Sequence, residues 1–199
     1  MHSVALLLGG NQGDRHALIH RATELIRQRV GSVALASALY ETEPWGDFEI
    51  ENPKLKIENF LNRALLVETE LSARDVLRQA LAIEKQLGRQ RKLLTPHPSP
   101  LTRKYTSRPI DIDIIFYDSE VIDEPDLTVP HPRMHLRRFV LEPLAEVMPD
   151  YVHPVLGKSV AEMLAEPTQW VTGTQAGVST PAHHASTNPE PPQGVTGTE

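Results

Sequence analysis

Apolar side chains recur along the chain with two different spacings, and the change between them predicts the order of strands and helices. Successive residues of a strand face opposite sides of a sheet, whereas positions three and four apart share one face of a helix. Apolar stripes with helical spacing run from about Asp14 to Val30 and from Ser72 to Gly88. Short apolar or alternating runs, typical of strands, occur at 4–8, 33–42, 60–70 and 110–117.

Both predicted helices begin and end at residues that are typical of helix termini. Asp14 and Ser72 can each accept a hydrogen bond from a backbone N–H of the first turn. Asp75 follows Ser72 by three residues, which approximates a capping box. Gly31 and Gly88 follow the last turns, where glycine commonly ends a helix. These signals fix the helix limits to within a few residues.

The remaining apolar runs predict shorter elements and complete a fold class. After the strand at 110–117 we expect a turn and a short return through 121–122, a helix at 134–148 and a last helix at 159–165. The core order is strand, helix, strand, strand, helix, strand. This order is that of the ferredoxin-like α+β fold, in which helices pack on an antiparallel sheet.

Composition divides the chain into two parts. From residue 167 onward the sequence is rich in Pro, Gly, Ser and Thr and has few apolar side chains, which is typical of disorder. We therefore predict a catalytic domain at 1–166 and a disordered tail at 167–199. Two long polar segments within the domain, 43–59 and 89–107, predict loops that close over substrates, since long loops in compact domains tend to be functional.

Charge and residue content exclude several classes of function. The chain has 26 acidic and 20 basic residues, a net charge of −6, which disfavours binding to nucleic acid through bulk charge. The absence of cysteine excludes thiolate catalysis and Cys-ligated zinc. No apolar run approaches the roughly 20 residues of a membrane span, and the N-terminus reads as a strand rather than a signal peptide. We expect a cytoplasmic protein without a membrane partner, and favour a monomer.

Two carboxylates, Asp111 and Asp113, interrupt the most apolar predicted strand. In a strand they share one face, with Cα atoms roughly 6.5–7 Å apart. This spacing suits one or two hard divalent cations, and Mg²⁺ is the natural candidate because it prefers oxygen ligands. The alternative is a solvated acidic face, since so short a motif also occurs by chance. Without a cation the carboxylates repel each other, so at least one should have a raised pKa.

Basic residues before and after this strand point towards phosphate chemistry. Arginine side chains beside a metal-binding pair neutralise charge on a transferred phosphoryl group, whereas a solvated charge run is the alternative. His131 lies between two prolines and beside further arginines, which fits a nucleotide contact, although a lone histidine is more often structural. No GxxxxGK[ST] phosphate-binding loop is present. The basic residues are Arg89, Arg91, Lys92, Arg103, Lys104 and Arg108, followed later by Arg133, Arg137 and Arg138.

Phe60 and Asn62 occupy alternate positions of one predicted strand and therefore share a face. An aromatic ring beside a side-chain amide offers stacking together with a paired donor and acceptor, which suits a planar, guanine-like heterocycle. Core packing beside a polar surface residue is the alternative interpretation.

Several segments, in this order and spacing, resemble the 6-hydroxymethyl-7,8-dihydropterin pyrophosphokinase family over residues 4–164. The resemblance implies transfer of pyrophosphate from ATP to the pterin hydroxymethyl group, giving AMP and the pterin diphosphate, in folate biosynthesis. The run from Arg108 to Tyr117 together with the later TVPHPRM segment is its most specific part. The segments are YETEPWG, NFLNRALLVET, EKQLGRQR, SRPIDIDIIFYD and LTVPHPRMHLRRFVLEPLAEV.

The resemblance also implies a role for individual residues. Asp111 and Asp113 would hold two Mg²⁺ ions that bridge the ATP phosphates, and Arg89 and Arg108 would assist the transfer. The ATP contacts map to Glu84, Arg91, Tyr105, Arg108, Ile114, Thr128, His131 and Arg137. The pterin contacts map to Thr42, Pro44, Trp45, Phe60, Asn62 and Phe139.

The sequence departs from the family pattern at a few positions, and two other functions remain as alternatives. Gly10 stands before Asn11 where serine is usual, and Tyr105 replaces a tryptophan. One alternative is a different Mg²⁺-dependent transferase that uses two aspartates, such as a nucleotidyl- or glycosyltransferase. The other is a ferredoxin-like RNA-binding module, which the acidic charge and the aromatic content of 5% disfavour.

Overall fold

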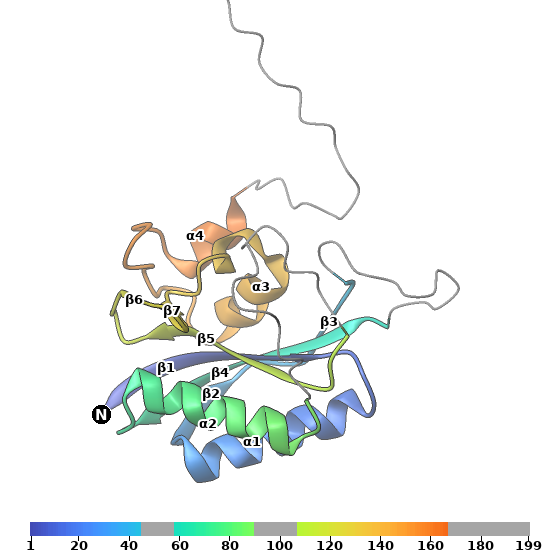
Figure 1. Ribbon diagram of the computed structural model, residues 1–199. Coiled ribbons are helices and arrows are strands. Elements are labelled where there is room, and N and C mark those ends of the chain that lie inside the picture. The colour runs from blue at the N-terminus through green and yellow to red at the C-terminus, as the bar shows by residue number, and fades with distance from the viewer. Residues whose placement is uncertain (45–57, 90–106, 167–199) are drawn as a thin grey trace, which may run out of the picture.

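An antiparallel sheet runs through the middle of the protein, with helices on both faces (Figure 1). The structure is a computed structural model, and it describes residues 1–44, 58–89 and 107–166. The strands of the sheet are β1 (His2–Gly10), β2 (Ser32–Ala36), β3 (Tyr40–Thr42), β4 (Phe60–Thr69) and β5 (Asp111–Tyr117).

The strand order confirms the predicted ferredoxin-like topology. The sheet runs β2-β4-β1-β5, with β3 also paired to β4, and all neighbouring strands are antiparallel. The predicted strand at 33–42 is therefore two short strands, β2 and β3, which pair with the same neighbour. The central position of β1 brings β4 and β5, far apart in sequence, to its two sides.

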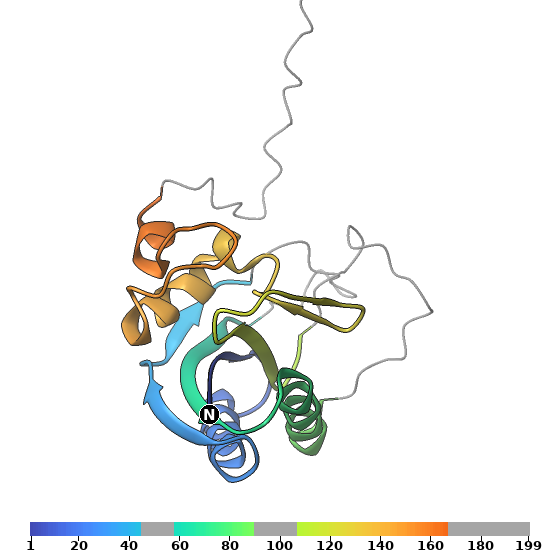
Figure 2. The ribbon, with the colours of Figure 1, turned by 90° about the vertical axis from the view of Figure 1, so that its left-hand side faces the viewer.

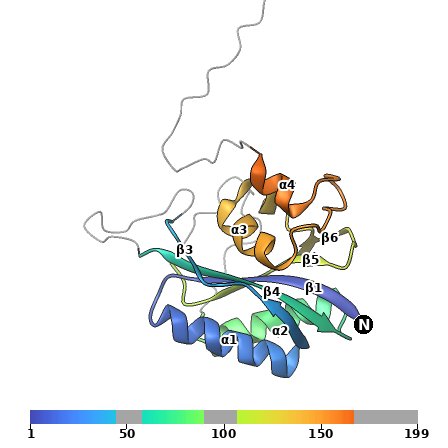
Figure 3. The same cartoon turned by 180° about the vertical axis from the view of Figure 1, so that it is seen from behind.

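The helices form two layers that cover opposite faces of the sheet. Helices α1 (Arg15–Arg29) and α2 (Ala73–Gln86) lie on one face, and α3 (Arg138–Val147) and α4 (Val160–Ala165) on the other (Figures 1 and 3). Each layer encloses its own cluster of buried apolar side chains. In the part of the chain that the structure describes, no helix is long and apolar enough to cross a membrane.

The helix starts agree with the predicted caps. The Asp14 carboxylate accepts a hydrogen bond from the Ala17 N–H at 3.0 Å, and the Ser72 hydroxyl accepts one from the Asp75 N–H at 3.2 Å. The reciprocal bond of a full capping box instead occurs at α4, where Ser159 and Glu162 each bind the other's backbone N–H. The sequence interpretation had not assigned that box.

The segment after β5 differs from the prediction. Strand β6 (Ile122–Glu124) pairs with β7 (Leu127–Val129) in a separate hairpin and does not return along β5 (Figure 2). Asp118 turns the chain away, since its backbone has a positive φ of 43° and its carboxylate accepts from the Ser3 N–H at 2.7 Å. Arg74 of α2 then holds the hairpin by ion pairs to its acidic residues.

The predicted helix at 134–148 is interrupted. A 3₁₀ turn, η2 (Met134–Leu136), is followed by Arg137 in an extended conformation, with φ −126° and ψ 104°, and only then by α3. The arginine at this break is buried, with 5% of its surface exposed. A regular 3.6-residue pattern concealed the interruption because apolar residues on both sides of it face the same core.

Candidate active site

The two aspartates lie side by side on the face of β5 opposite Ile110, Ile112 and Ile114. Those isoleucines are buried in the core cluster beneath α1 and α2. A bulge follows, because the register with β1 shifts between Ala5 and Leu6. As a result Ile115 and Phe116 both belong to the cluster beneath α3 and α4. The carboxylates therefore face the α3 side of the sheet, where the apolar core beneath α3 and α4 begins directly after them.

Asp111 is held by two arginines, one on each carboxylate oxygen. Arg89 Nη1 donates to Oδ1 and Arg108 Nη1 donates to Oδ2. All three side chains are largely buried, at 16–18% exposure. The structure therefore confirms that the predicted basic residues at 89 and 108 adjoin the aspartate pair.

Glu84 of α2 connects this cluster to the strand backbone. Its Oε1 accepts from Arg89 Nη1 at 2.7 Å and from the Ile112 N–H, between the aspartates, at 2.9 Å. The side chain is 1% exposed, so its charge depends on these donors. Glu84 thus fixes both Arg89 and the middle of the Asp111–Asp113 segment.

The two aspartates differ in pKa although they share a strand and a face. Burial and the negative charge of Asp111 raise the pKa of Asp113 to about 7. Burial also acts to raise the pKa of Asp111, but the charges of Arg108 and Arg89 outweigh it and lower that pKa below 3.8. The expectation that one carboxyl group has a raised pKa is confirmed. At neutral pH Asp111 is ionised and paired, while Asp113 holds a proton part of the time.

The carboxylates of Asp111 and Asp113 fit a cation that is also coordinated by water and by a bound phosphate. Among residues 1–44, 58–89 and 107–166, no three His, Cys, Asp or Glu side chains converge as a complete metal cage. Two adjacent carboxylates provide hard oxygen ligands and leave the other coordination positions to water and phosphate, as Mg²⁺ prefers. Burial, followed by the charge of Asp111, raises the pKa of Asp113, so a cation bound there would favour its ionised form.

His131 and Arg137 follow the β6–β7 hairpin in the chain, and both interact electrostatically with the aspartate pair. The His131 N–H donates to the Ile115 carbonyl at 3.0 Å, which holds this segment against β5. Burial, followed by the charges of Arg137 and Arg133, lowers the pKa of His131 to about 4. The ring is therefore neutral at physiological pH. Because its Nδ1 accepts from the Arg133 N–H at 3.3 Å, the ring proton is on Nε2.

Asn62 and Phe60 lie on the same side of the sheet as the aspartates. Asn62 is 3% exposed, and its Nδ2 donates to Thr42 Oγ1 of β3 at 2.8 Å. Phe139, at the start of α3, lies beside Arg137, whose guanidinium carbon is 5.7 Å from its ring centre. The structure thus brings the Asn62 amide and the Thr42 hydroxyl together and places Phe60 and Asn62 on one face of β4, as predicted.

A single glycine separates the amide from the carboxylates. In the sheet register Gly9 of β1 is paired with Asn62 on one side and with Asp111 on the other. We call these three residues the central row. A Cβ atom at Gly9 would lie 2.7 Å from Asn62 Oδ1, too close for any side chain without displacing the amide. The surface between the Asn62 amide and the Asp111 carboxylate therefore consists of backbone alone.

Several predicted site residues lie outside the described residues, and one, Ile114, has a restricted role. Trp45, Arg91 and Tyr105 lie outside the described residues, as do Lys92, Arg103 and Lys104. Pro44 follows β3 directly, and Thr128 belongs to the β6–β7 hairpin. The Ile114 side chain is 6% exposed in the core beneath α1 and α2, so only its main chain can face the site.

Sequence reasoning missed the importance of Gly9 and Asn11. Both belong to GGNQGDR, the segment between the predicted strand at 4–8 and the predicted helix that begins at Asp14. Asn11 is 2% exposed and forms hydrogen bonds to residues that precede β4 and β5. Its position directly after a buried strand was the one available signal.

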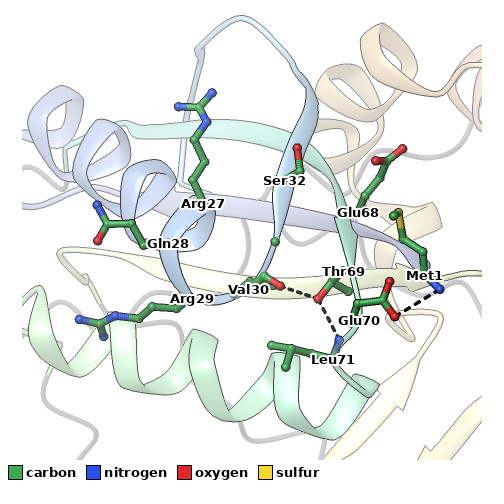
Figure 4. Close-up of a pocket in the computed structure, with 11 residues that line it drawn as sticks. Met1, Arg27, Gln28, Arg29, Val30, Ser32, Glu68, Thr69, Glu70 and Leu71 are labelled. Carbon is green, nitrogen blue, oxygen red and sulfur yellow. Dashed lines mark hydrogen bonds and ion pairs between the residues drawn. The ribbon is translucent and has the colours of Figure 1, made fainter.

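A second hollow lies at the opposite end of the sheet, between the end of α1 and the end of β4 (Figure 4). There Thr69 Oγ1 donates to the Val30 carbonyl at 2.5 Å and accepts from the Leu71 N–H at 3.1 Å. Thr69 is seven positions from Asn62 on β4, which corresponds to roughly 23 Å. No aspartate or aromatic residue lines this hollow, so the central row is the better candidate.

Comparison with known proteins identifies one family. The sequence model of the 7,8-dihydro-6-hydroxymethylpterin-pyrophosphokinase family matches residues 5–149. The chain is 41% identical over 155 residues to the 2-amino-4-hydroxy-6-hydroxymethyldihydropteridine pyrophosphokinase of Porphyromonas gingivalis, covering 77% of this chain and 95% of that protein. It is 35% identical over 168 residues to the Aquifex aeolicus protein of the same name, covering 84% and 94%.

Solved structures support the fold. A crystal structure of Plasmodium falciparum HPPK-DHPS aligns with a TM-score of 0.60 at 18% identity, covering 82% of this chain. The chain spans 43% of that structure. At this level of identity the match confirms the architecture, and the sequence relatives carry the family assignment.

Proposed function

Because this chain belongs to the 7,8-dihydro-6-hydroxymethylpterin-pyrophosphokinase family, it is a pyrophosphokinase of folate biosynthesis, and we propose that its reaction takes place across the central row. The enzyme transfers pyrophosphate from ATP to the hydroxymethyl group of 6-hydroxymethyl-7,8-dihydropterin, releasing AMP. The observation that supports this location is the register: Asn62, Gly9 and Asp111 are direct neighbours on three adjacent strands. A pterin on Asn62 then lies within reach of a triphosphate above the aspartates.

Asn62 is suited to recognise the pterin ring. The bond from Nδ2 to Thr42 fixes the amide plane and leaves the carbonyl and one N–H to pair with a heterocycle edge. Phe60 and Phe139 supply the two apolar surfaces between which a flat ring can stack. Thr42 therefore acts by orienting Asn62, and Pro44 and Trp45 stay predicted neighbours of the same ring.

Asp111 and Asp113 would be the protein ligands of two Mg²⁺ ions that accompany ATP. When bound, such ions neutralise phosphate oxygens and orient the reacting phosphorus. The protein contributes two deprotonated carboxylates on one face of β5, whose Cα atoms are roughly 6.5–7 Å apart. Asp113 must therefore lose its proton as the nucleotide complex binds.

The arginines supply the remaining positive charge. Arg89 and Arg108 contact Asp111 here, and both can turn to phosphate oxygens once a cation takes over that carboxylate. Arg137 is also buried, and its charge acts on both Asp113 and His131. Neutral His131 offers an Nε2–H donor to a nucleotide oxygen.

The transfer then requires positioning more than acid–base catalysis. The pterin hydroxyl oxygen forms a bond to the β-phosphorus, the bond from that phosphorus to the α-phosphate oxygen breaks, and AMP leaves. The hydroxyl proton passes to solvent. With a loose transition state, alignment and charge neutralisation account for most of the rate.

A product assay tests the proposal. The protein is incubated with Mg²⁺, ATP and 6-hydroxymethyl-7,8-dihydropterin, and the nucleotide products are separated. We expect AMP and pterin diphosphate in equal amounts, with none formed after Mg²⁺ is removed by a chelator. ADP as the nucleotide product would indicate a simple kinase, and release of free pyrophosphate would indicate nucleotidyl transfer. Asp113→Ala, made in parallel, should form no AMP.

Other features stay predictions. The nucleotide contacts of Arg91 and Tyr105, a monomeric state and a cytoplasmic location have no direct support in the described residues. The division into a catalytic domain at 1–166 and a tail at 167–199 is likewise a sequence-based prediction.

A further inference from the structure

Asn11 joins the segments that enter β4 and β5. Its Oδ1 accepts from the Arg108 N–H at 2.9 Å, and its own N–H donates to the Arg108 carbonyl at 3.0 Å. Its Nδ2 donates to the Glu58 carbonyl at 3.2 Å and to Ser107 Oγ at 3.1 Å. One buried side chain at the end of β1 therefore holds residues that lie 47 and 97 positions away in the sequence.

Asn11 holds the main chain of Arg108 in place. Both the N–H and the carbonyl of Arg108 are hydrogen-bonded to Asn11. The neighbouring Gly10 presses against the same segment, since a Cβ there would lie 2.2 Å from the Pro109 carbonyl oxygen. The absence of a side chain at Gly10 thus allows the two backbones to meet. The Arg108 side chain then starts from a defined point and reaches Asp111 three residues later.

The segment before β4 has an additional attachment that does not involve Asn11. Arg15 Nη1 donates to the Asn59 carbonyl at 2.7 Å and to the Glu41 carboxylate at 3.0 Å. Loss of Asn11 should therefore leave Phe60 and Asn62 close to their places. The same loss removes the side-chain bonds to Ser107 and to the Arg108 N–H, so its effect should fall mainly on Arg108.

We propose that Asn11 is a positioning residue for pyrophosphate transfer, which acts by fixing the main chain of Arg108. The inference rests on the proposed role of Arg108 at the phosphates. Because small displacements of a transfer group cost about 10²-fold in rate, Asn11→Ala should lower kcat by about 10- to 100-fold. The KM for the pterin should change by less than about 3-fold, since Asn62 keeps its own contacts.

A double-mutant cycle distinguishes this role from a general loss of stability. Asn11→Ala, Arg108→Ala and the double variant are compared by kcat for AMP formation at a temperature where all are folded. If Asn11 acts through Arg108, the double variant is no slower than Arg108→Ala alone. If the alanine variant does not fold, Asn11→Ser, whose short hydroxyl cannot span from Arg108 to Glu58, goes through the same cycle.

Thr69 provides a matched control. Like Asn11 it is buried and uses its side chain to join separate segments, but it lies at the far end of the sheet (Figure 4). Thr69→Val should lower the melting temperature while kcat stays within about 2-fold of wild type. Comparable losses of kcat in Thr69→Val and Asn11→Ala would show a stability effect and overturn the inference.

The remaining outcomes separate this inference from the proposed function. An unchanged kcat in Asn11→Ala, or a double variant whose loss is the product of the two single losses, overturns the role of Asn11 alone. An unchanged kcat in Arg108→Ala overturns the role of Arg108 as well. Equal loss in Arg108→Ala and the double variant, together with an active Thr69→Val, supports the inference.

Discussion

Replacing Asp113 with asparagine should stabilise the protein without ligands while it abolishes activity. The Asp113 pKa is raised from 3.8 to about 7, so the folded state holds the proton more tightly than the unfolded state does. The stability from this proton is fully present below pH 3.8 and is lost as the pH rises through 7. Integrated over this window, ionisation of Asp113 costs the fold at most about 4 kcal/mol.

The pH dependence makes this prediction specific. Asparagine has a similar shape but no charge, so Asp113→Asn should be more stable than wild type by a margin that grows by roughly 2–3 kcal/mol from pH 5 to pH 8. The free energy of unfolding is measured by urea denaturation at both pH values, without Mg²⁺ or nucleotide. AMP formation is measured on the same samples and should be lost, because the substitution removes a proposed metal ligand.

Asp111→Asn is the matched control on the same strand and face. Here the carboxylate compensates Arg89 and Arg108, and its loss leaves two largely buried cations with a weaker partner. We expect destabilisation of about 1–3 kcal/mol, the opposite sign to Asp113→Asn. A margin for Asp113→Asn that does not change with pH, or the same sign for both variants, would refute the electrostatic reasoning.

Further predictions concern binding, the floor of the site and the tail. Asn62→Ala should weaken pterin binding by about 1–3 kcal/mol, and calorimetry with an inert ATP analogue that found unchanged affinity would show the pocket to be misplaced. Gly9→Ala should likewise weaken pterin binding, because its Cβ would meet Asn62 Oδ1 at 2.7 Å, whereas unchanged affinity would mean that the amide is not used. Binding of Mg²⁺ with the analogue at pH 7 should release about half a proton from Asp113, measured in buffers of different ionisation enthalpy, and no buffer dependence would contradict its pKa of about 7. Deleting residues 167–199 should leave kcat and melting temperature almost unchanged, and a large fall in either would assign the tail a structural role.

Local signals in the sequence predicted the main elements because helix caps and apolar periodicity depend on neighbouring residues. Asp14 and Ser72 begin helices where predicted, and β5 contains the alternation that placed Asp111 and Asp113 on one face. The extended Arg137 was not predictable in the same way. Its conformation depends on a buried position beside Asp113 and His131, which is a tertiary effect.

The site could be predicted as a set of residue types but not as a geometry. The resemblance assigned roles to Asn62 and Asp111, yet nothing in the chain order indicates that both pair with Gly9. Strand register is set by the whole sheet, including the bulge at Ile115, and so appears only in three dimensions. The hydrogen bonds of Asn11 likewise join segments that are distant in sequence, for which a single chain offers no signal.

If the pterin binds at Asn62 and the phosphates above Asp111, as proposed, the central row also determines the length of ligand that the enzyme accepts. The distance between Asn62 and Asp111 consists of two hydrogen-bonded strand spacings, roughly 10 Å, and no side chain contributes to it. Substitutions on the surface of the sheet cannot change this distance, because it is set by the hydrogen bonds between strand backbones. A synthetic inhibitor that links a pterin to a phosphate chain must have a linker of matching length. One additional bond in the linker would move either the ring or the phosphates away from the residues that bind them.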